Sequence, residues 1–357
     1  MRKYTSQVIS YLSRYLSFSK ISNKINGIDL LVTDRFADGE MEVTVNNSIR
    51  GKDVVLFTSC ARHNEAGLSV EEAKIELYSA IDALKRSQAN KIIVYEPYIS
   101  CSRSDRTTRR GSVGLWVHLK TIFSLGVCHT ITFQLHSDKS KTMVDPSLHA
   151  IDDIPVQSLL KRYLCDNFIK SIEKLDNDVK NRWAFCSVDA GGEKLARIFA
   201  NSFGTPLVVA HKQRDYSKPN KVNYINILSS EPLEGKTLWI VDDMIDTAGS
   251  IETLIRALQD HKPKEINVIA VHALFSPPAK ERLLSLSSEG LLNRLVVTDT
   301  VSLNNELIPN IEIVPSTEHA AKIIKTIICN ESMSNLLMPF NARKYLEQLQ
   351  PSQIPIV

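Results

Sequence analysis

Residues 241–250 read VDDMIDTAGS, and this stretch decides how the whole chain is interpreted. The apolar residues 237–241 predict a buried strand that ends at the two acids Asp242 and Asp243. A turn of small residues then leads into a predicted helix, Ser250–Gln259. The apolar residues that share one face of this helix are Ile251, Leu254, Ile255 and Leu258. A strand, a small-residue turn and a helix in this order predict an α/β unit with an anion site at the turn.

The turn has the chemistry of a ribose-phosphate site. The backbone N–H groups and two hydroxyls of residues 247–250 can surround a phosphate, which the partial positive charge of the helix N-terminus attracts. Asp242 and Asp243 would repel a bare polyphosphate, so we expect them to accept hydrogen bonds from sugar hydroxyls. The alternative is a simple helix cap at Asp246. That alternative explains neither the three acids nor the apolar strand.

Strands and helices alternate along the chain, which favours parallel sheets covered on both faces. The predicted strands are 52–59, 91–95, 129–135, 183–188, 206–210, 236–241, 266–274, 295–301 and 311–314. The predicted helices are 69–87, 113–125, 157–169, 192–203, 250–259 and 342–349, and in the first of them Ala73, Leu77, Ala80, Ile81 and Leu84 share one face. The alternation restarts near residues 153–158. We therefore expect an α/β protein with domains at 1–157 and 158–329 and an extension at 330–357.

Composition excludes several classes of protein. The 357 residues are 43% hydrophobic and 23% charged, which is typical of a globular chain and not of a disordered or fibrous one. A net charge of +3 is too small for a broad nucleic-acid surface. No apolar run approaches the roughly 18 residues of a membrane span. The six cysteines include no CxxC pair, which favours reduced thiols in a cytosolic protein.

The N-terminus allows two interpretations. Residues 1–28 contain five basic side chains and no acidic one, with Val8, Leu12, Tyr15 and Leu16 on one helical face. An organelle-targeting peptide has this composition, and so does the first amphipathic helix of a fold. We favour the amphipathic helix because no small-residue cleavage site or polar linker follows.

The chain resembles the ribose-phosphate diphosphokinases, also called phosphoribosyl pyrophosphate synthases, over about residues 28–325. Residues 241–250 are similar to the ribose-5-phosphate loop of phosphoribosyltransferase-type folds. Further motifs follow in the family's order: RFADGE at 35–40, RGKDV at 50–54, IDALKR at 81–86, SRSDR at 102–106, SVDAGG at 187–192, HKQR at 211–214 and VVTDT at 296–300. The resemblance implies two similar phosphoribosyltransferase-type domains, each a mainly parallel sheet flanked by helices.

The resemblance also implies roles for individual residues. The ATP-binding residues would be Phe36, Asp38, Glu40, Arg103, Ser104 and Asp105, with Phe36 stacked on adenine. In the family the Phe36 loop reaches the ATP site of a neighbouring subunit. Ribose 5-phosphate would be held by Asp242, Asp243, Asp246, Thr247, Ala248, Gly249 and Ser250.

Metal and catalytic roles are carried over in the same way. His136 and Asp189 would position Mg²⁺ on the phosphates, and Lys212 and Arg214 would lie on a flexible loop that closes over the reacting groups. Phosphoryl transfer needs positioning and charge neutralisation, and Mg²⁺ takes few protein ligands, so a sparse set suffices. Taken alone, His136 is a strand-end histidine, Asp189 a helix cap, and the two cations a solvated loop.

The expected function is ATP:ribose-5-phosphate diphosphotransfer, which makes 5-phosphoribosyl 1-diphosphate and AMP for nucleotide biosynthesis. We expect a cytoplasmic homo-oligomer, a dimer or hexamer, with no nucleic-acid or membrane partner. One alternative is a diphosphokinase for a larger ribosyl phosphate such as ADP-ribose, suggested by Ser104 and by the long segment 137–149. A non-catalytic regulatory paralogue and a phosphoribosyltransferase are the others, although the intact loop and the two similar halves weigh against them.

Overall fold

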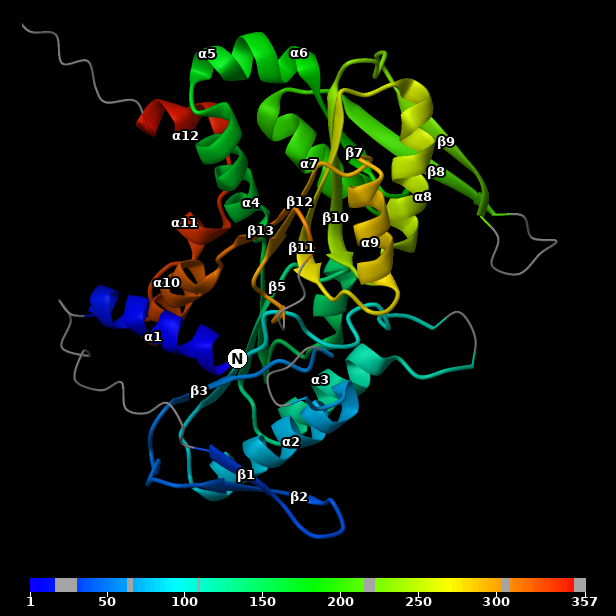
Figure 1. Ribbon diagram of the computed structural model, residues 1–357. Coiled ribbons are helices and arrows are strands. Elements are labelled where there is room, and N and C mark those ends of the chain that lie inside the picture. The colour runs from blue at the N-terminus through cyan, green and yellow to red at the C-terminus, as the bar shows by residue number, and fades with distance from the viewer. Residues whose placement is uncertain (17–30, 63–66, 108–109, 215–221, 304–307, 350–357) are drawn as a thin grey trace, which may run out of the picture. The chain divides into compact units, whose positions relative to one another are not determined.

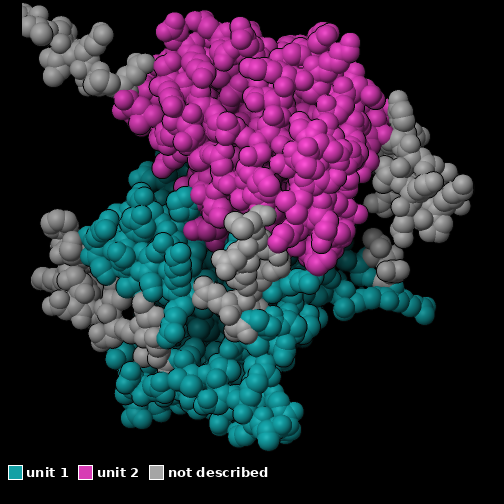
Figure 2. Space-filling view, viewed as in Figure 1, with its two compact units in different colours: residues 1–155, 300–304, 315–338 teal, residues 156–299, 305–314, 339–357 magenta. Residues whose placement is uncertain are grey.

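The computed structural model describes the chain except residues 17–30, 63–66, 108–109, 215–221, 304–307 and 350–357. The chain divides into two compact units, drawn in different colours in Figure 2. Unit 1 comprises residues 1–155, 300–304 and 315–338, and unit 2 comprises residues 156–299, 305–314 and 339–357. Each unit combines segments that are separated in the sequence. The domain boundaries predicted after residues 157 and 329 stay predictions.

Unit 1 contains a parallel sheet and a separate hairpin (Figure 1). In the described part of this unit the sheet has the strand order β3 (Val54–Phe57), β4 (Ile92–Tyr95), β5 (His129–Phe133) and β6 (Ala150–Ile154). The hairpin pairs β1 (Leu31–Arg35) with β2 (Met41–Val45) in antiparallel register. The helices are α1 (Arg2–Leu16), α2 (Val70–Arg86), α3 (Gly114–Ser124), α10 (Thr317–Ile328) and α11 (Ser334–Leu337).

Helix α2 shows how the sequence determines an element. Ser69 Oγ accepts a hydrogen bond from the Glu72 N–H, and Glu72 Oε2 accepts one from the Ser69 N–H, which forms a capping box. Its buried residues are Ala73, Lys74, Leu77, Ala80, Ile81 and Leu84. The apolar members of this set confirm the face predicted from periodicity, which packs into the core of unit 1.

Helix α1 is an amphipathic helix packed within unit 1. Val8 and Leu12 are buried, and the helix lies beside α10. The Tyr4 hydroxyl lies 2.7 Å from the Tyr95 hydroxyl and 2.8 Å from Ser316 Oγ. The helix predicted for the N-terminus is therefore confirmed.

Unit 2 is built on a larger sheet. Within its described residues the strand order is β13 (Ile311–Val314), β12 (Arg294–Thr298), β11 (Glu265–Ala273), β10 (Thr237–Ile245), β7 (Trp183–Ser187), β8 (Leu207–Arg214) and β9 (Val222–Ser229). All neighbours are parallel except β8 and β9. The central strands are buried over nearly their whole length, as expected of parallel strands covered on both faces.

The helices of unit 2 follow most of these strands. They are α4 (Gln157–Leu164), α5 (Ile172–Lys174), α6 (Lys180–Arg182), α7 (Glu193–Phe203), α8 (Gly249–Leu258), α9 (Ala279–Ser288) and α12 (Ala342–Leu349). The α/β class and the parallel sheets predicted from the sequence are confirmed. The sequence did not predict β1, β2, β6, β9, α9 or α10.

Two features concern the described residues as a whole. All six cysteines lie there, and none forms a disulfide. As for membranes, none of the helices seen in the described ranges is both long enough and apolar enough to cross a bilayer.

Candidate functional site

The predicted ribose-phosphate loop lies at the carboxyl end of β10. The strand does not end at Val241, as predicted, but continues through both acids to Ile245. Pairing with β11 extends it, because Asp242 lies opposite Ala270 and Ile245 lies opposite Ala273. The backbone that carries the two carboxylates thus belongs to the sheet and not to a turn.

Helix α8 begins directly after the loop. Ala248 occupies the N-cap position in the left-handed conformation, with φ of 57°. The N-cap residue is therefore Ala248 and not Asp246. The predicted apolar face is confirmed, since Ile251, Leu254, Ile255 and Leu258 are all buried. The helix N-terminus is fixed in place with its backbone groups directed at the loop.

Three carboxylates meet at this end of the sheet. The register of β7 with β10 pairs Ser187 with Val241, so Asp189 follows β7 level with the acids of β10. Burial raises the pKa of Asp242 well above its usual value, and the carboxylates of Asp243 and Asp189 raise it further. A cation or hydroxyl donors bound here would relieve the repulsion among these three carboxylates. Among the described residues, however, no three His, Cys, Asp or Glu side chains are arranged to hold a metal ion.

Asp189 also stabilises its own turn. Its Oδ1 accepts hydrogen bonds from the N–H groups of Gly191 at 2.9 Å and Gly192 at 3.1 Å. These bonds order the turn before α7, but the N-cap residue of that helix is Gly192 and not Asp189. The predicted magnesium role of Asp189 stays a prediction.

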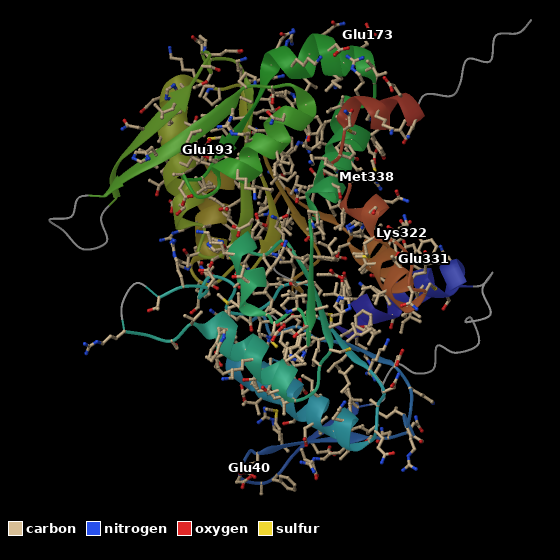
Figure 3. The ribbon with its side chains drawn as sticks, turned by 180° about the vertical axis from the view of Figure 1, so that it is seen from behind. Glu40, Glu173, Glu193, Lys322, Glu331 and Met338 are labelled. Atoms are coloured by element: carbon tan, nitrogen blue, oxygen red, sulfur yellow. The ribbon has the colours of Figure 1, made fainter. Side chains whose placement is uncertain are left out.

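The predicted adenine-stacking residue lies at the end of the β1–β2 hairpin in unit 1. Phe36 is 55% exposed, and Asp38 and Glu40 beside it are also exposed. Figure 3 labels Glu40 at this hairpin. Arg35 donates a hydrogen bond to the Gly39 carbonyl at 2.9 Å and pairs with Glu72 of α2 at 3.1 Å. The hairpin is thereby tied to α2, while its aromatic ring faces solvent in this chain.

The second ATP segment, Arg103–Asp105, lies before α3 in the same unit. Ser104 Oγ accepts a hydrogen bond from the Gly114 N–H at 2.9 Å. A side chain on Gly114 would approach that oxygen to 3.2 Å and Cys101 Sγ to 3.3 Å. Ser104 therefore holds its loop against the start of α3, and Arg103 beside it is exposed.

The family resemblance implied that Lys212 and Arg214 lie on a loop, but they do not. Their backbones lie in β8, where Lys212 is opposite Ile225 and Arg214 is opposite Val222 of β9. The error arose because the antiparallel partner β9 was not predicted. Their side chains, and residues 215–221, lie outside the described residues, so their catalytic role stays a prediction.

His136 is exposed shortly after β5 in unit 1. Asp189 belongs to unit 2. The magnesium pair was predicted from the family resemblance alone, and it also stays a prediction.

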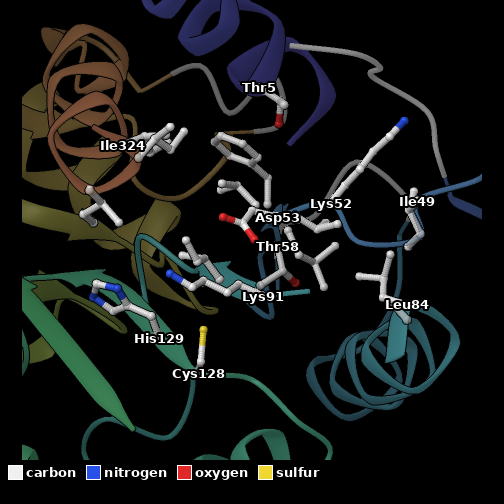
Figure 4. A pocket seen from close by; sticks show the side chains of 18 of the residues that line it. Thr5, Ile49, Lys52, Asp53, Thr58, Leu84, Lys91, Cys128, His129 and Ile324 are labelled. Carbon is white, nitrogen blue, oxygen red and sulfur yellow. The ribbon is translucent and has the colours of Figure 1, made fainter. Parts of the chain in front are cut away.

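A pocket of about 1990 Å³ in unit 1 holds none of the predicted site residues (Figure 4). It is lined by β3, including Thr58 just beyond its end, and by residues of α1, α2 and α10, with Lys52, Asp53, Lys91 and His129 among its polar groups. We assign the substrates to the predicted loops and not to this pocket, because none of the predicted ATP, ribose 5-phosphate, metal or catalytic residues lines it, although Lys52 and Asp53 of the family motif at 50–54 do.

Comparison with known proteins covers almost the whole chain. Residues 14–126 match the family described as the N-terminal domain of ribose phosphate pyrophosphokinase, and residues 160–285 match the phosphoribosyl transferase domain. The chain is 32% identical over 338 residues to a ribose-phosphate pyrophosphokinase of Campylobacter jejuni, covering 94% of this chain and 96% of the relative. It is 31% identical to that of Bacillus caldolyticus, covering 83% of this chain and 86% of the relative.

The chain belongs to the ribose-phosphate pyrophosphokinase family.

A solved structure supports the fold independently. The phosphoribosylpyrophosphate synthetase of Mycobacterium smegmatis superposes with a TM-score of 0.74 at 23% identity, covering 91% of this chain and 96% of that one. The two domain types of ribose-phosphate pyrophosphokinases correspond to the two sheets described above, which confirms the predicted fold class.

The structure adds one residue that the sequence did not single out. Arg282 of α9 donates a hydrogen bond from Nη1 to the Thr247 carbonyl at 2.8 Å. Its Nε also lies 3.2 Å from Glu252 Oε2 in the first turn of α8. No local sequence signal identifies this contact, because it depends on how α9 packs beside α8.

Proposed function

We propose that this chain is an ATP:ribose-5-phosphate diphosphotransferase that makes 5-phosphoribosyl 1-diphosphate and AMP. The observation that carries the proposal is the full-length similarity to ribose-phosphate pyrophosphokinases, together with an intact loop at residues 241–250. The anomeric hydroxyl of ribose 5-phosphate attacks the β-phosphorus of ATP in line, and AMP leaves. The enzyme acts in nucleotide biosynthesis in the cytoplasm, which fits six cysteines without a disulfide.

The ribose 5-phosphate site is proposed at the β10–α8 junction. Backbone N–H groups of residues 247–250, the two hydroxyls and the helix N-terminus bind the 5-phosphate. Asp242, Asp243 and Asp246 accept hydrogen bonds from the ribose hydroxyls. Sheet hydrogen bonding fixes the carboxylates of β10 in advance, so little rearrangement is needed on binding.

The ATP site is proposed on the loops of unit 1. Phe36 stacks on adenine, with Asp38 and Glu40 beside it, and Arg103, Ser104 and Asp105 line the rest of the site. A ring that is 55% exposed in its own chain suits a surface that another subunit completes. We therefore propose a homo-oligomer, a dimer or hexamer, in which the hairpin contributes to the ATP site of a neighbour.

Asp189 offers Mg²⁺ the kind of ligand it prefers. Mg²⁺ takes few protein oxygens when substrate phosphates supply the rest, and Asp189 lies among carboxylates whose mutual repulsion a cation relieves. We propose that His136 and Asp189 hold Mg²⁺, which neutralises phosphate charge. Lys212 and Arg214 stabilise charge on the transferring diphosphate.

The test is the product set formed from ATP, Mg²⁺ and ribose 5-phosphate, separated by anion-exchange chromatography. Equal amounts of AMP and 5-phosphoribosyl 1-diphosphate are expected. A parallel reaction with ADP-ribose as acceptor should be at least tenfold slower. ADP as the nucleotide product, or faster reaction with ADP-ribose, would contradict the proposed acceptor and reaction, and no reaction at all would favour a non-catalytic paralogue.

A further inference from the structure

Arg282 lies on the outer side of the ribose-phosphate loop. Its Nη1 donates to the Thr247 carbonyl at 2.8 Å, and a Cβ built on Gly249 would fall 2.8 Å from the same nitrogen. The guanidinium therefore lies directly against the backbone of the turn. Since a side chain at Gly249 would collide with it, the contact requires glycine at that position.

The hydrogen bond has a geometric consequence for the phosphate site. In a trans peptide the carbonyl of one residue and the N–H of the next point in opposite directions. With the Thr247 carbonyl bound to Arg282, the Ala248 N–H points away from α9, to the opposite side of the turn. The left-handed conformation of Ala248, with φ of 57°, then leads the chain into α8. One side of the turn thus faces the arginine, and the other carries donors.

The same guanidinium also offsets a charge. Glu252 lies in the first turn of α8, where its carboxylate would repel a phosphate approaching the helix N-terminus. Arg282 Nε lies 3.2 Å from Glu252 Oε2, and Arg256 lies 3.3 Å from Glu252 Oε1. Both arginines pair with this carboxylate, and Arg282 in addition donates a hydrogen bond to the Thr247 carbonyl of the turn.

We infer that Arg282 is a positioning residue of the ribose 5-phosphate site, which holds the Thr247–Ala248 peptide plane so that its N–H faces the 5-phosphate. The inference rests on the proposed function, because it names the group that orients the phosphate-binding turn. Among the described residues, Arg282 donates to the Thr247 carbonyl and pairs with Glu252. Its loss should weaken ribose 5-phosphate and leave the nucleotide site unchanged.

The first experiment compares Arg282→Gln with Arg256→Gln. We expect Arg282→Gln to weaken ribose 5-phosphate about tenfold in calorimetric titration and in KM, with the KM of ATP unchanged within twofold. Arg256→Gln removes a cation from the same Glu252 but no donor from the turn, so its effect should stay below threefold. Equal effects of the two variants would overturn the positioning role in favour of general charge neutralisation.

The second experiment uses Gly249→Ala, whose methyl displaces the guanidinium without removing it. Gly249 lies in a helix, so alanine suits its backbone, and the atom it meets is the mobile end of a side chain. We expect about a tenfold loss of ribose 5-phosphate affinity in the wild-type background and less than twofold in Arg282→Gln. The same loss in both backgrounds would mean that the methyl blocks the ligand itself, which overturns the inference.

Failure of the proposed function gives a different result. If the wild-type chain binds no ribose 5-phosphate in titration at millimolar concentration, the site assignment is wrong and the inference about Arg282 is wrong with it. If the wild type binds and Arg282→Gln binds equally well, only the inference is wrong. Because Arg282 is partly exposed, the variants should fold, and a thermal melt within about 3 °C of the wild type checks this.

Discussion

The two proposed substrate loops are built in opposite ways. The ribose-phosphate loop continues a nine-residue strand of a seven-stranded sheet and leads into a helix with four buried side chains. The proposed adenine loop joins the strands of a separate two-stranded sheet, and its phenyl ring is 55% exposed. One loop is braced from several sides within a single chain, whereas the other presents its key side chain to solvent.

The difference indicates where each site obtains its rigidity. Isolated two-stranded hairpins are marginally stable, so β1 and β2 depend on contacts such as that between Arg35 and Glu72. The β10–α8 junction is held by pairing on both sides of β10 and by Arg282. We expect changes in the hairpin to affect nucleotide binding without affecting stability, and changes at the junction to affect the sugar site alone.

The largest effect is expected at Lys212, on the antiparallel edge of unit 2. Lys212→Ala should lower kcat at least about a hundredfold, about 3 kcal/mol, because interactions made mainly in the transition state act on the rate. The KM of both substrates should change far less, as steady-state kinetics will measure. The control is Lys344→Ala, an exposed lysine of α12. A kcat within twofold of the wild type would remove Lys212 from the mechanism.

The next effect tests the braced loop. Asp243→Asn and Asp246→Asn should each weaken ribose 5-phosphate by about 1.5–3 kcal/mol, since the sugar hydroxyls lose a charged acceptor. ATP affinity should stay within threefold, as measured by titration with each substrate. Asp260→Asn, an exposed acid beyond α8, is the matched control. Equal weakening of both substrates would show that the loop is assigned to the wrong ligand.

A smaller effect is expected at the exposed loop. Phe36→Ala should raise the KM of ATP about five- to thirtyfold, which corresponds to the loss of about 1–2 kcal/mol of base stacking on an aromatic ring. The melting temperature should not fall. Phe36→Leu, which keeps apolar surface without the ring, should recover little of the affinity.

The same variant tests the shared site. Mixed oligomers of Phe36→Ala with Lys212→Ala should regain part of the activity, because one neighbouring pair then carries both intact residues. No recovery in verified mixed oligomers would contradict a hairpin that serves another subunit.

The last prediction concerns stability and not activity, through Lys161, a cation buried in unit 2. Burial lowers the pKa of Lys161 to about 8, and its Nζ contacts Ser202 Oγ at 3.2 Å beside the rings of Phe199 and Phe340. Between about pH 8 and pH 10.5 the unfolded chain binds more protons at this group, so the free energy of unfolding rises with pH across that window.

Lys161→Met should remove this rise and stabilise the protein near pH 7 by about 1–3 kcal/mol. Denaturant titrations at pH 7, 8, 9 and 10 measure both quantities. Lys174→Met, at an exposed lysine of α5, should retain the slope. If the free energy of unfolding of Lys161→Met still rises with pH as in the wild type, Lys161 is not the cause of the rise.

Much of the fold follows from the sequence, because buried faces repeat with the period of their element. The faces of α2 and α8 were predicted residue by residue. Strand ends were not, since β10 and β8 are extended by the partners they pair with and not by their own composition. The hairpin β1–β2 and the edge strand β9 were missed, although residues 41–45, MEVTV, alternate between apolar and polar side chains as a half-buried strand does.

The site divides in the same way. The loop at residues 241–250 could be predicted because its strand, turn and helix are contiguous in the sequence. The role of Arg282 could not be predicted, because its contact with Thr247 spans 35 residues and depends on the packing of α9. Asp189 was found by the family resemblance, and its place level with Asp243 follows only from the sheet register.

The most direct measurement of the central claim is a ³¹P NMR time course of ATP, Mg²⁺ and ribose 5-phosphate with the wild-type enzyme. The account predicts that the three ATP resonances disappear together with the growth of an AMP resonance and of two coupled diphosphate resonances on the sugar, in equal amounts. Growth of ADP resonances with a single new phosphate ester would mean transfer of the γ-phosphoryl group alone, and would contradict the account.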